Sequence, residues 1–142
     1  MHGFSRMTSK TIEVQKILAF LSSQQIWEPA SSQYISSVFV GICNFSLQDP
    51  GVNEFVERVT QQMKETEMEI NARAIANTMY YMRHYHSRKN TRMIGLLQVI
   101  NQRLAVCPDY FSARELNSAT FGLRHLSDCH PEVQVLLVHV LP

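Results

Sequence analysis

A pattern of apolar residues recurs along the chain at a nearly constant interval, and this repetition constrains the fold more than any other feature. Residues 75–85 form the clearest copy, and weaker copies stand at residues 35–45 and 116–126. The intervals are 75 − 35 = 40 and 116 − 75 = 41 residues. A period in this range is typical of stacked supersecondary units, which bury their apolar faces against one another. The sequence therefore predicts a repeat protein.

Each copy has the spacing of an amphipathic helix and follows a residue that can cap one. Ser31, Asn71 and Ser112 stand four residues before the first apolar anchor of their copies, where a side-chain oxygen can accept from the free N–H groups of a first turn. Helical spacing then continues through Ile35, Val38, Ile42 and Phe45; Ile75, Thr78, Met82 and Tyr85; and Leu116, Ala119, Leu123 and Leu126. We predict that each copy is the first helix of its unit.

A second apolar stripe follows each first helix after a turn. The turns are predicted at residues 49–51, 87–90 and 128–131. The stripes, spaced i, i+3, i+4, i+7, comprise Val52, Phe55, Val56 and Val59; Met93, Leu96, Leu97 and Ile100; and Val133, Leu136, Leu137 and Val140. Each unit is therefore expected to be a helical hairpin. Gly95 lies inside a second helix at a cost of about 1 kcal/mol against alanine, so we expect close packing there.

The remaining segments complete the predicted organisation. Residues 8–21 favour a leading helix capped by Thr8 or Ser9, and residues 22–29 have the composition of a turn. The fold class is all-α, a right-handed α-solenoid of about three helix-turn-helix repeats with an extra leading helix. Its expected divisions are a disordered or targeting-like terminus at 1–7, a leading helix and linker at 8–30, and repeats at 31–70, 71–111 and 112–142.

The last helix, at residues 133–141, is apolar nearly all round. A terminal helix of a free solenoid should carry a polar outer face. We therefore expect this helix to be covered by further repeats of a longer chain or by a protein partner.

Composition restricts the class of partner. The net charge is +1 and 18% of the residues are charged, so the whole molecule exerts no strong attraction on phosphate or anionic lipid. No apolar run reaches about 18 residues, which excludes a membrane-spanning segment and predicts no membrane partner. The 3 cysteines are odd in number and dissimilar in setting, which indicates a reducing compartment. Residues 1–12 contain Arg6 and Lys10 but no acid, as in a mitochondrial transit peptide or a disordered terminus.

Residues 111–126 carry a resemblance to a known family. Their order of cap, small, leucine, Asn-Ser, aromatic, small, leucine, basic and leucine resembles the octotricopeptide-like helical-hairpin repeats of organelle RNA-binding proteins, which are related to pentatricopeptide-type α-solenoids. Phe121 stands at the usual tryptophan position and Ser112-Ala113 at the usual cap, while Tyr80 and Val40 take the aromatic place in the other units. The resemblance covers residues 31–142, although the period here is longer than the family's usual one.

The resemblance implies a superhelix whose first helices contact single-stranded or ribosomal RNA in a mitochondrion or another organelle. Its candidate contacts are polar positions of the first helices: Gln33, Arg73 and Arg114 near the helix starts, then Ser37, Asn77 and Ser118. Arginine and free helix N–H groups suit phosphate, whereas asparagine and serine can meet base edges in an unpaired strand.

Residues 83–92 form the densest basic stretch, with Arg88, Lys89 and Arg92 as candidate phosphate contacts, and a solvated turn is the alternative interpretation. His84, His86 and Cys129-His130 do not have the spacing of a zinc site, so we predict no metal.

Without a phosphate-binding glycine loop, a nucleophile elbow or paired carboxylates in a plausible pocket, we predict neither catalysis nor a cofactor. Tyr80 is expected to be mostly buried, and Tyr81 is left open between core packing and base stacking.

Two functions follow. The first is non-catalytic RNA binding as a processing, translation or ribosome-associated factor of an organelle. The second is a protein-interaction scaffold of a large assembly, without direct RNA contact. The nearly neutral charge favours the scaffold, whereas the aligned polar positions and the basic stretch favour RNA.

Overall fold

The protein is all-α, as predicted, over the residues that the computed structural model describes: 11–23, 32–46, 48–65, 69–85, 91–124, 126 and 131–140, apart from the side chains of residues 22, 50, 85, 91, 92 and 140. Within these ranges there is no strand. The helices are α1 (Ile12–Ser23), α2 (Ser32–Ile42), α3 (Pro50–Glu65), α4 (Ala72–Met82), the short 3-10 helix η2 (Arg83–Tyr85), α5 (Thr91–Ala105), α6 (Ala113–Leu123) and α7 (Pro131–Val140).

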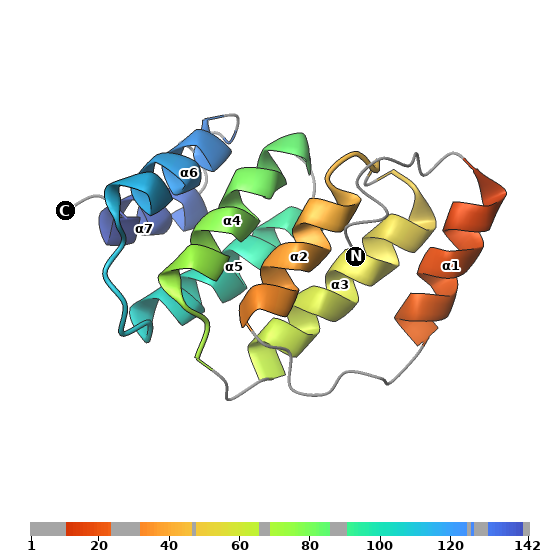
Figure 1. Ribbon diagram of the computed structural model, residues 1–142, viewed down its shortest axis with the longest axis horizontal. Helices are drawn as coiled ribbons and strands as arrows, with labels where there is room; N and C mark the ends of the chain where they lie inside the picture. Colours follow the sequence, from red (N-terminus) through yellow and green to blue (C-terminus); the bar gives the residue numbers. More distant parts are fainter. Residues whose placement is uncertain are drawn as a thin grey trace.

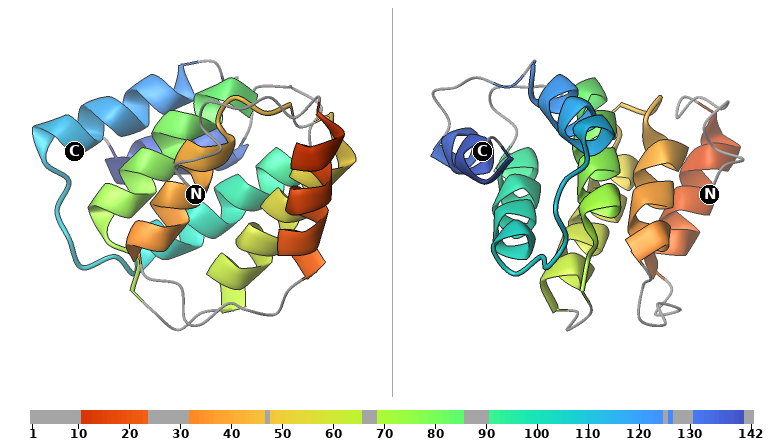
Figure 2. Two further views of the ribbon diagram at one scale, coloured as in Figure 1. Left: turned by 45° about the vertical axis from the view of Figure 1, so that its right-hand side comes forward. Right: turned by 60° about the vertical axis from the view of Figure 1, so that its left-hand side comes forward.

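The helices lie in two layers. One layer contains α2, α4 and α6 side by side, and the other contains α3, α5 and α7, with α1 packed against α3 (Figure 1). The right-hand view of Figure 2 separates α5 and α7 from α4 and α6. In the first layer the three helices run in the same direction, so their N-terminal ends lie along one edge of the layer (Figure 1).

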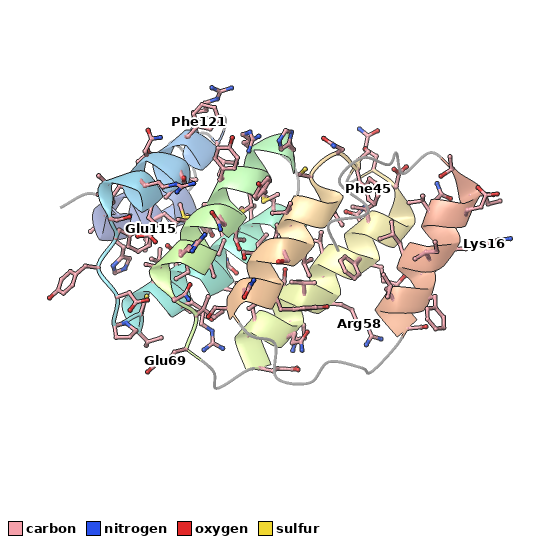
Figure 3. All side chains as sticks on the ribbon, viewed as in Figure 1. Lys16, Phe45, Arg58, Glu69, Glu115 and Phe121 are labelled. Carbon is pink, nitrogen blue, oxygen red and sulfur yellow. The ribbon has the colours of Figure 1, made fainter. Side chains whose placement is uncertain are left out.

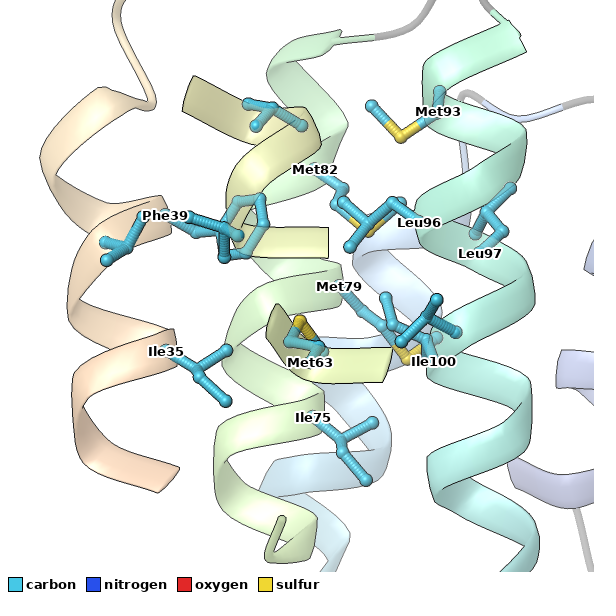
Figure 4. Close-up of a cluster of buried hydrophobic side chains, with 14 of the residues drawn as sticks. Ile35, Phe39, Met63, Ile75, Met79, Met82, Met93, Leu96, Leu97 and Ile100 are labelled. Atoms are coloured by element: carbon cyan, nitrogen blue, oxygen red, sulfur yellow. The ribbon is translucent and has the colours of Figure 1, made fainter. Parts of the chain in front are cut away.

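The core lies between the two layers. The predicted stripes are confirmed: every described residue of those on α3, α5 and α7 is at most 3% exposed except Leu137, which is half-buried. The α4 residues Ile75, Met79 and Met82 lie between the α2 side chains, among them Phe39, and the α5 side chains, among them Leu96 (Figure 4). Helix α4 is therefore the central element of the described core.

Two of the three predicted caps are confirmed. The Asn71 side chain accepts a hydrogen bond of 2.8 Å from the backbone N–H of Ala74. Ser112 begins a reciprocal capping box, because its Oγ accepts from the backbone N–H of Glu115 at 3.4 Å while a Glu115 carboxylate oxygen accepts from the backbone N–H of Ser112 at 2.8 Å. Ser31 lies outside the described residues. These caps fix where α4 and α6 begin.

Some predicted boundaries were wrong. Pro50 and Gly51 were placed in a turn, but α3 begins at Pro50, and the backbone oxygen of Asp49 accepts from the N–H groups of Val52 and Asn53. Pro131, also assigned to a turn, likewise opens α7. Proline suits the first position of a helix because its fixed φ is helical and its missing N–H would have had no partner there.

The leading helix is also shifted. It spans Ile12–Ser23, so residues 22 and 23 are helical instead of turn. The predicted caps Thr8 and Ser9 lie outside the described residues, as do the predicted turns at 87–90 and 128–130.

Polar contacts join segments that lie 37 to 40 residues apart in the chain, at corresponding places. Ser32 Oγ donates to the backbone oxygen of Glu69 at 3.0 Å and accepts from the N–H of Asn71 at 3.2 Å. One period later, the N–H of Ala72 donates to an Asp109 carboxylate oxygen at 3.3 Å. Arg103 on α5 donates to the Met63 carbonyl oxygen, which lies in the last turn of α3. Such contacts satisfy backbone groups that a helix end leaves without partners.

The close helix packing predicted at Gly95 was wrong, because a Cβ built there has open space around it. The close approach occurs at Gly122 of α6. A Cβ at Gly122 would overlap the backbone oxygen of Met79 and lie 2.9 Å from the backbone nitrogen of Tyr80. Gly122 therefore allows the backbones of α6 and α4 to touch, whereas α5 does not need its glycine for packing.

Candidate functional site

A groove of about 360 Å³ runs between α2 and α4. Its α2 wall consists of Gln33, Ser36, Ser37 and Val40, and its α4 wall consists of Asn71, Arg73, Ala74 and Asn77. Most of these residues are polar, in contrast to the apolar core behind them. The groove brings together four of the residues that the sequence predicted as RNA contacts: Gln33, Ser37, Arg73 and Asn77.

Helical spacing explains why these side chains share one face. Gln33 and Ser37 are separated by four residues on α2, as are Arg73 and Asn77 on α4, and residues at i and i+4 lie one above the other. Gln33 and Arg73 are exposed, and Ser37 and Asn77 are half-buried. Of these four predicted residues, the two near the helix starts are therefore exposed and the two farther along the helices are more protected.

The side chains of Arg73 and Asn77 are available for a ligand. Within the described part of the chain, neither makes a hydrogen bond. An asparagine amide offers two donors and one acceptor, and a guanidinium offers five donors in a planar fork. The N-terminal ends of α2 and α4 add a partial positive charge to the same end of the groove. Together these groups suit an anionic ligand that also carries hydrogen-bonding edges.

The equivalent α6 residues do not join this groove. Arg114 is exposed and Ser118 is half-buried on α6, and neither lines the space between α2 and α4. The structure thus separates the predicted set of six first-helix residues into four groove residues and two on the neighbouring helix. The close packing of α6 on α4 at Gly122 is the physical difference between the two helix pairs.

Glu115 of α6 does not line the groove but interacts electrostatically with the groove residue Arg73, and sequence reasoning missed it. The pKa of the Glu115 carboxyl lies below its usual value. The main cause is the hydrogen bond from the Ser112 side chain, followed by the one from the Ser112 backbone N–H, and the charges of Arg73 and Arg114 lower the pKa further. The carboxylate therefore stays ionised and offsets part of the positive charge of the two arginines. The serine-to-glutamate spacing of a capping box was the available signal.

The basic stretch is only partly described. Arg88 and Lys89 lie outside the described residues, and Arg92 belongs to the first turn of α5 but its side chain lies outside them. His84, at the preceding η2 helix, is exposed. The three predicted phosphate contacts of this stretch are therefore not placed relative to the groove.

The tyrosines of α4 differ from expectation. Tyr80, predicted to be mostly buried, is only half-buried: its ring stacks, with ring centroids 5.5 Å apart, on Phe121, which is itself half-buried. Tyr81 is half-buried and packs against the core. The two rings meet edge to face at 5.1 Å. Tyr80 therefore contributes to the surface of the layer that also contains the groove.

The described residues were also compared with the requirements of metal sites, membrane-spanning helices and reactive thiols. Among the described residues no three His, Cys, Asp or Glu side chains are grouped as metal ligands would be. No helix within the described ranges is long and apolar enough to cross a membrane. Cys43 and Cys107 carry free thiols, and burial raises the pKa of both above the usual value, which reduces the reactive thiolate form.

Comparisons of the chain with protein-family models, with curated proteins and with solved structures find no match.

Proposed function

We propose that this chain is a non-catalytic helical-repeat protein that binds single-stranded RNA through the layer of α2, α4 and α6. The observation that carries the proposal is the polar groove in which Gln33, Ser37, Arg73 and Asn77 converge. Amide and hydroxyl groups can read the edges of unpaired bases, and an arginine beside helix N-terminal ends can hold a phosphate.

The proposal includes a right-handed α-solenoid whose units are α2–α3, α4–α5 and α6–α7. It is supported by polar contacts at matching places, with intervals of 69 − 32 = 37 residues between Ser32 and Glu69 and 109 − 72 = 37 between Ala72 and Asp109. An RNA strand would then run along the layer of first helices. Location in a mitochondrion or another organelle rests on the composition of residues 1–12 and on the family resemblance.

The test is the affinity of the chain for fluorescently labelled single-stranded RNA, measured by anisotropy over a range of salt. We expect the logarithm of the binding constant to fall linearly with the logarithm of salt concentration, because counterions are released from the phosphates. The double variant Arg73→Gln/Asn77→Ala should bind about tenfold more weakly, as expected for the loss of about 1.4 kcal/mol. Replacing Arg88, Lys89 and Arg92 together by alanine should weaken binding equally for all RNA sequences.

A matched control for charge is Lys16→Gln, since Lys16 is exposed on α1, far from α4 and α6 (Figure 3). This variant should bind as the unmodified chain does. RNA binding that is independent of salt, or unaltered affinity in both the groove variant and the basic-stretch variant, would contradict the proposal.

For Glu115 we expect a substitution that raises RNA affinity instead of lowering it. Glu115→Gln removes a negative charge beside Arg73 and Arg114 but keeps an oxygen that can accept from the Ser112 N–H. Because removing this carboxylate charge leaves the positive charge of the two arginines less offset, RNA affinity should rise about threefold. Glu54→Gln, at an exposed position of α3, is the control and should leave affinity unchanged. Weaker binding by Glu115→Gln would show that the carboxylate does not repel the ligand.

A scaffold without RNA contact is the second candidate, and exposed apolar residues at the two ends of the second layer favour it. Phe20 of α1 is 60% exposed, and Val138 of α7 is 77% exposed. Large apolar side chains gathered at a surface often mark a protein interface. Further repeats or a protein subunit that covers α7 would bury Val138 and its neighbour Val135. Absence of RNA binding in the titration above would leave this candidate as the better explanation.

A further inference from the structure

Aromatic and arginine side chains form a cluster at the C-terminal ends of α4 and α6. We define the aromatic–arginine cluster as Tyr80, Tyr81, Arg83, Phe121 and Arg124. The guanidinium carbon of Arg83 lies 3.8 Å from the ring centroid of Tyr80, and that of Arg124 lies 4.0 Å from the ring centroid of Phe121. The same pair, an aromatic residue with arginine three positions later, thus occurs in two successive units.

The two pairs are joined into one surface. The rings of Tyr80 and Phe121 stack with centroids 5.5 Å apart and planes inclined by 25°. Arg83 also lies 5.7 Å from the centroids of both Tyr81 and Phe121. A guanidinium so close to aromatic rings is held by cation–π attraction and loses little further freedom when it binds a ligand.

The Arg83 guanidinium has N–H donors that its own hydrogen bond does not use. It is half-buried, and its Nη1 donates to the backbone oxygen of Tyr80 at 2.7 Å. The guanidinium has five N–H donors, so this bond leaves most of them unused. Within the described residues no carboxylate forms an ion pair with Arg83. A half-buried cation without an anionic partner is a favourable place for an incoming phosphate or carboxylate.

The cluster continues the face that contains the groove. Tyr80 follows Asn77 by three residues and Arg73 by seven, which places all three on one face of α4. Phe121 has the same relation to Ser118 and Arg114 on α6. At about 1.5 Å of rise per residue, Tyr80 lies only about 4.5 Å farther along the helix axis than Asn77. Glu115 and Phe121 lie at opposite ends of α6, so the cluster occupies the end away from the helix starts (Figure 3).

We propose that the aromatic–arginine cluster binds the backbone of the RNA strand whose bases enter the groove, with Arg83 and Arg124 as phosphate contacts. This inference rests on the proposed function and assigns it a second contact region. Arginine forks match phosphate oxygens, and unpaired bases stack on guanidinium planes as well as on rings. An acidic peptide would use the same cations but would leave the stacked, partly exposed rings without a planar partner.

The experiment compares single variants in the RNA titration at several salt concentrations. Arg83→Gln should weaken binding about fivefold and reduce the salt slope by about 0.7, the contribution of one phosphate contact to a single strand. Arg83→Lys keeps a point charge without the planar fork and should lie between Arg83→Gln and the unmodified chain. Arg124→Gln, an exposed position, provides a second variant if Arg83→Gln unfolds, and should also reduce the slope.

The matched control is Arg58→Gln, which removes the same charge from an exposed position of α3 (Figure 3). It should leave affinity and slope unchanged. Weaker RNA binding and a smaller salt slope in Arg83→Gln and Arg124→Gln, but not in Arg58→Gln, support the inference. If Arg83→Gln and Arg124→Gln both kept the affinity and salt slope of the unmodified chain while Arg73→Gln/Asn77→Ala bound more weakly, the inference about the cluster would be overturned and the groove proposal would stand. Failure of the unmodified chain to bind any RNA would overturn both.

Discussion

Replacement of Gly122 by alanine is expected to lower the midpoint of thermal unfolding by about 8 °C. The added Cβ would overlap the Met79 backbone oxygen and approach the Tyr80 nitrogen to 2.9 Å, and both atoms belong to a helix that cannot adjust as a side chain can. Alanine gains about 1 kcal/mol from helix propensity, but forcing two packed helices apart costs about 3 kcal/mol. The net loss of about 2 kcal/mol corresponds to that temperature shift in a chain of this size.

Gly95→Ala is the matched control for this prediction. A Cβ at Gly95 meets nothing within 4 Å, so only the gain in helix propensity remains. The unfolding midpoint should rise by up to about 4 °C. Circular dichroism melts of the two variants and the unmodified chain provide the comparison. If both glycine variants shifted the midpoint in the same direction, the close approach of α6 to α4 would be contradicted.

Replacement of Phe39 by alanine should have a still larger effect on stability. Phe39 is 0% exposed and lies on α2 beside the side chains of α4 and α3 (Figure 4). Truncation of a buried phenylalanine removes its transfer free energy and leaves a cavity, at a total cost of about 3 to 5 kcal/mol. Because small domains are stable by only about 5 to 15 kcal/mol, we expect this variant to lose a large part of its free energy of unfolding.

The control for Phe39 is an exposed aromatic residue. Tyr110 is 98% exposed, and Tyr110→Ala should change the free energy of unfolding by no more than about 0.5 kcal/mol. Urea titrations followed by circular dichroism measure both values. Equal losses in the two variants would mean that α2 does not pack as described.

Much of the fold follows from apolar periodicity. The stripes of α3 and α5 were predicted correctly because an i, i+3, i+4, i+7 pattern on a helix admits one buried face. Asn71 and Ser112 were predicted as caps because their side chains satisfy backbone groups locally, without knowledge of tertiary contacts. Pro50 was misassigned because the same residue suits a turn and the first position of a helix.

Features that depend on a neighbouring helix were less predictable. The sequence shows that Gly95 and Gly122 both lie in helices, but only the arrangement in space shows which glycine faces another backbone. The half-burial of Tyr80 depends in the same way on the distance between α4 and α6.

In the candidate site, too, the features that follow from periodicity along one helix were predicted, and those that depend on a second helix were not. Periodicity placed Gln33 and Ser37 on one face of α2, and Arg73 and Asn77 on one face of α4, but it did not show that a groove would form between these two helices and separate them from Arg114 and Ser118. The capping box of Glu115 could be read from the sequence, but its interaction with Arg73 of α4, and that of Arg83 with the Phe121 ring of α6, depend on the arrangement of the helices.

RNA binding by the layer of α2, α4 and α6 is tested residue by residue by NMR mapping of backbone amide signals during titration with single-stranded RNA. We expect the largest shifts at the groove residues Ser37 and Asn77, further shifts at Arg83 and Phe121, and little change at α1 and α7. Shifts confined to α7, around the exposed Val138, or no shifts even with RNA in large excess over the protein, would contradict RNA binding by the layer of α2, α4 and α6.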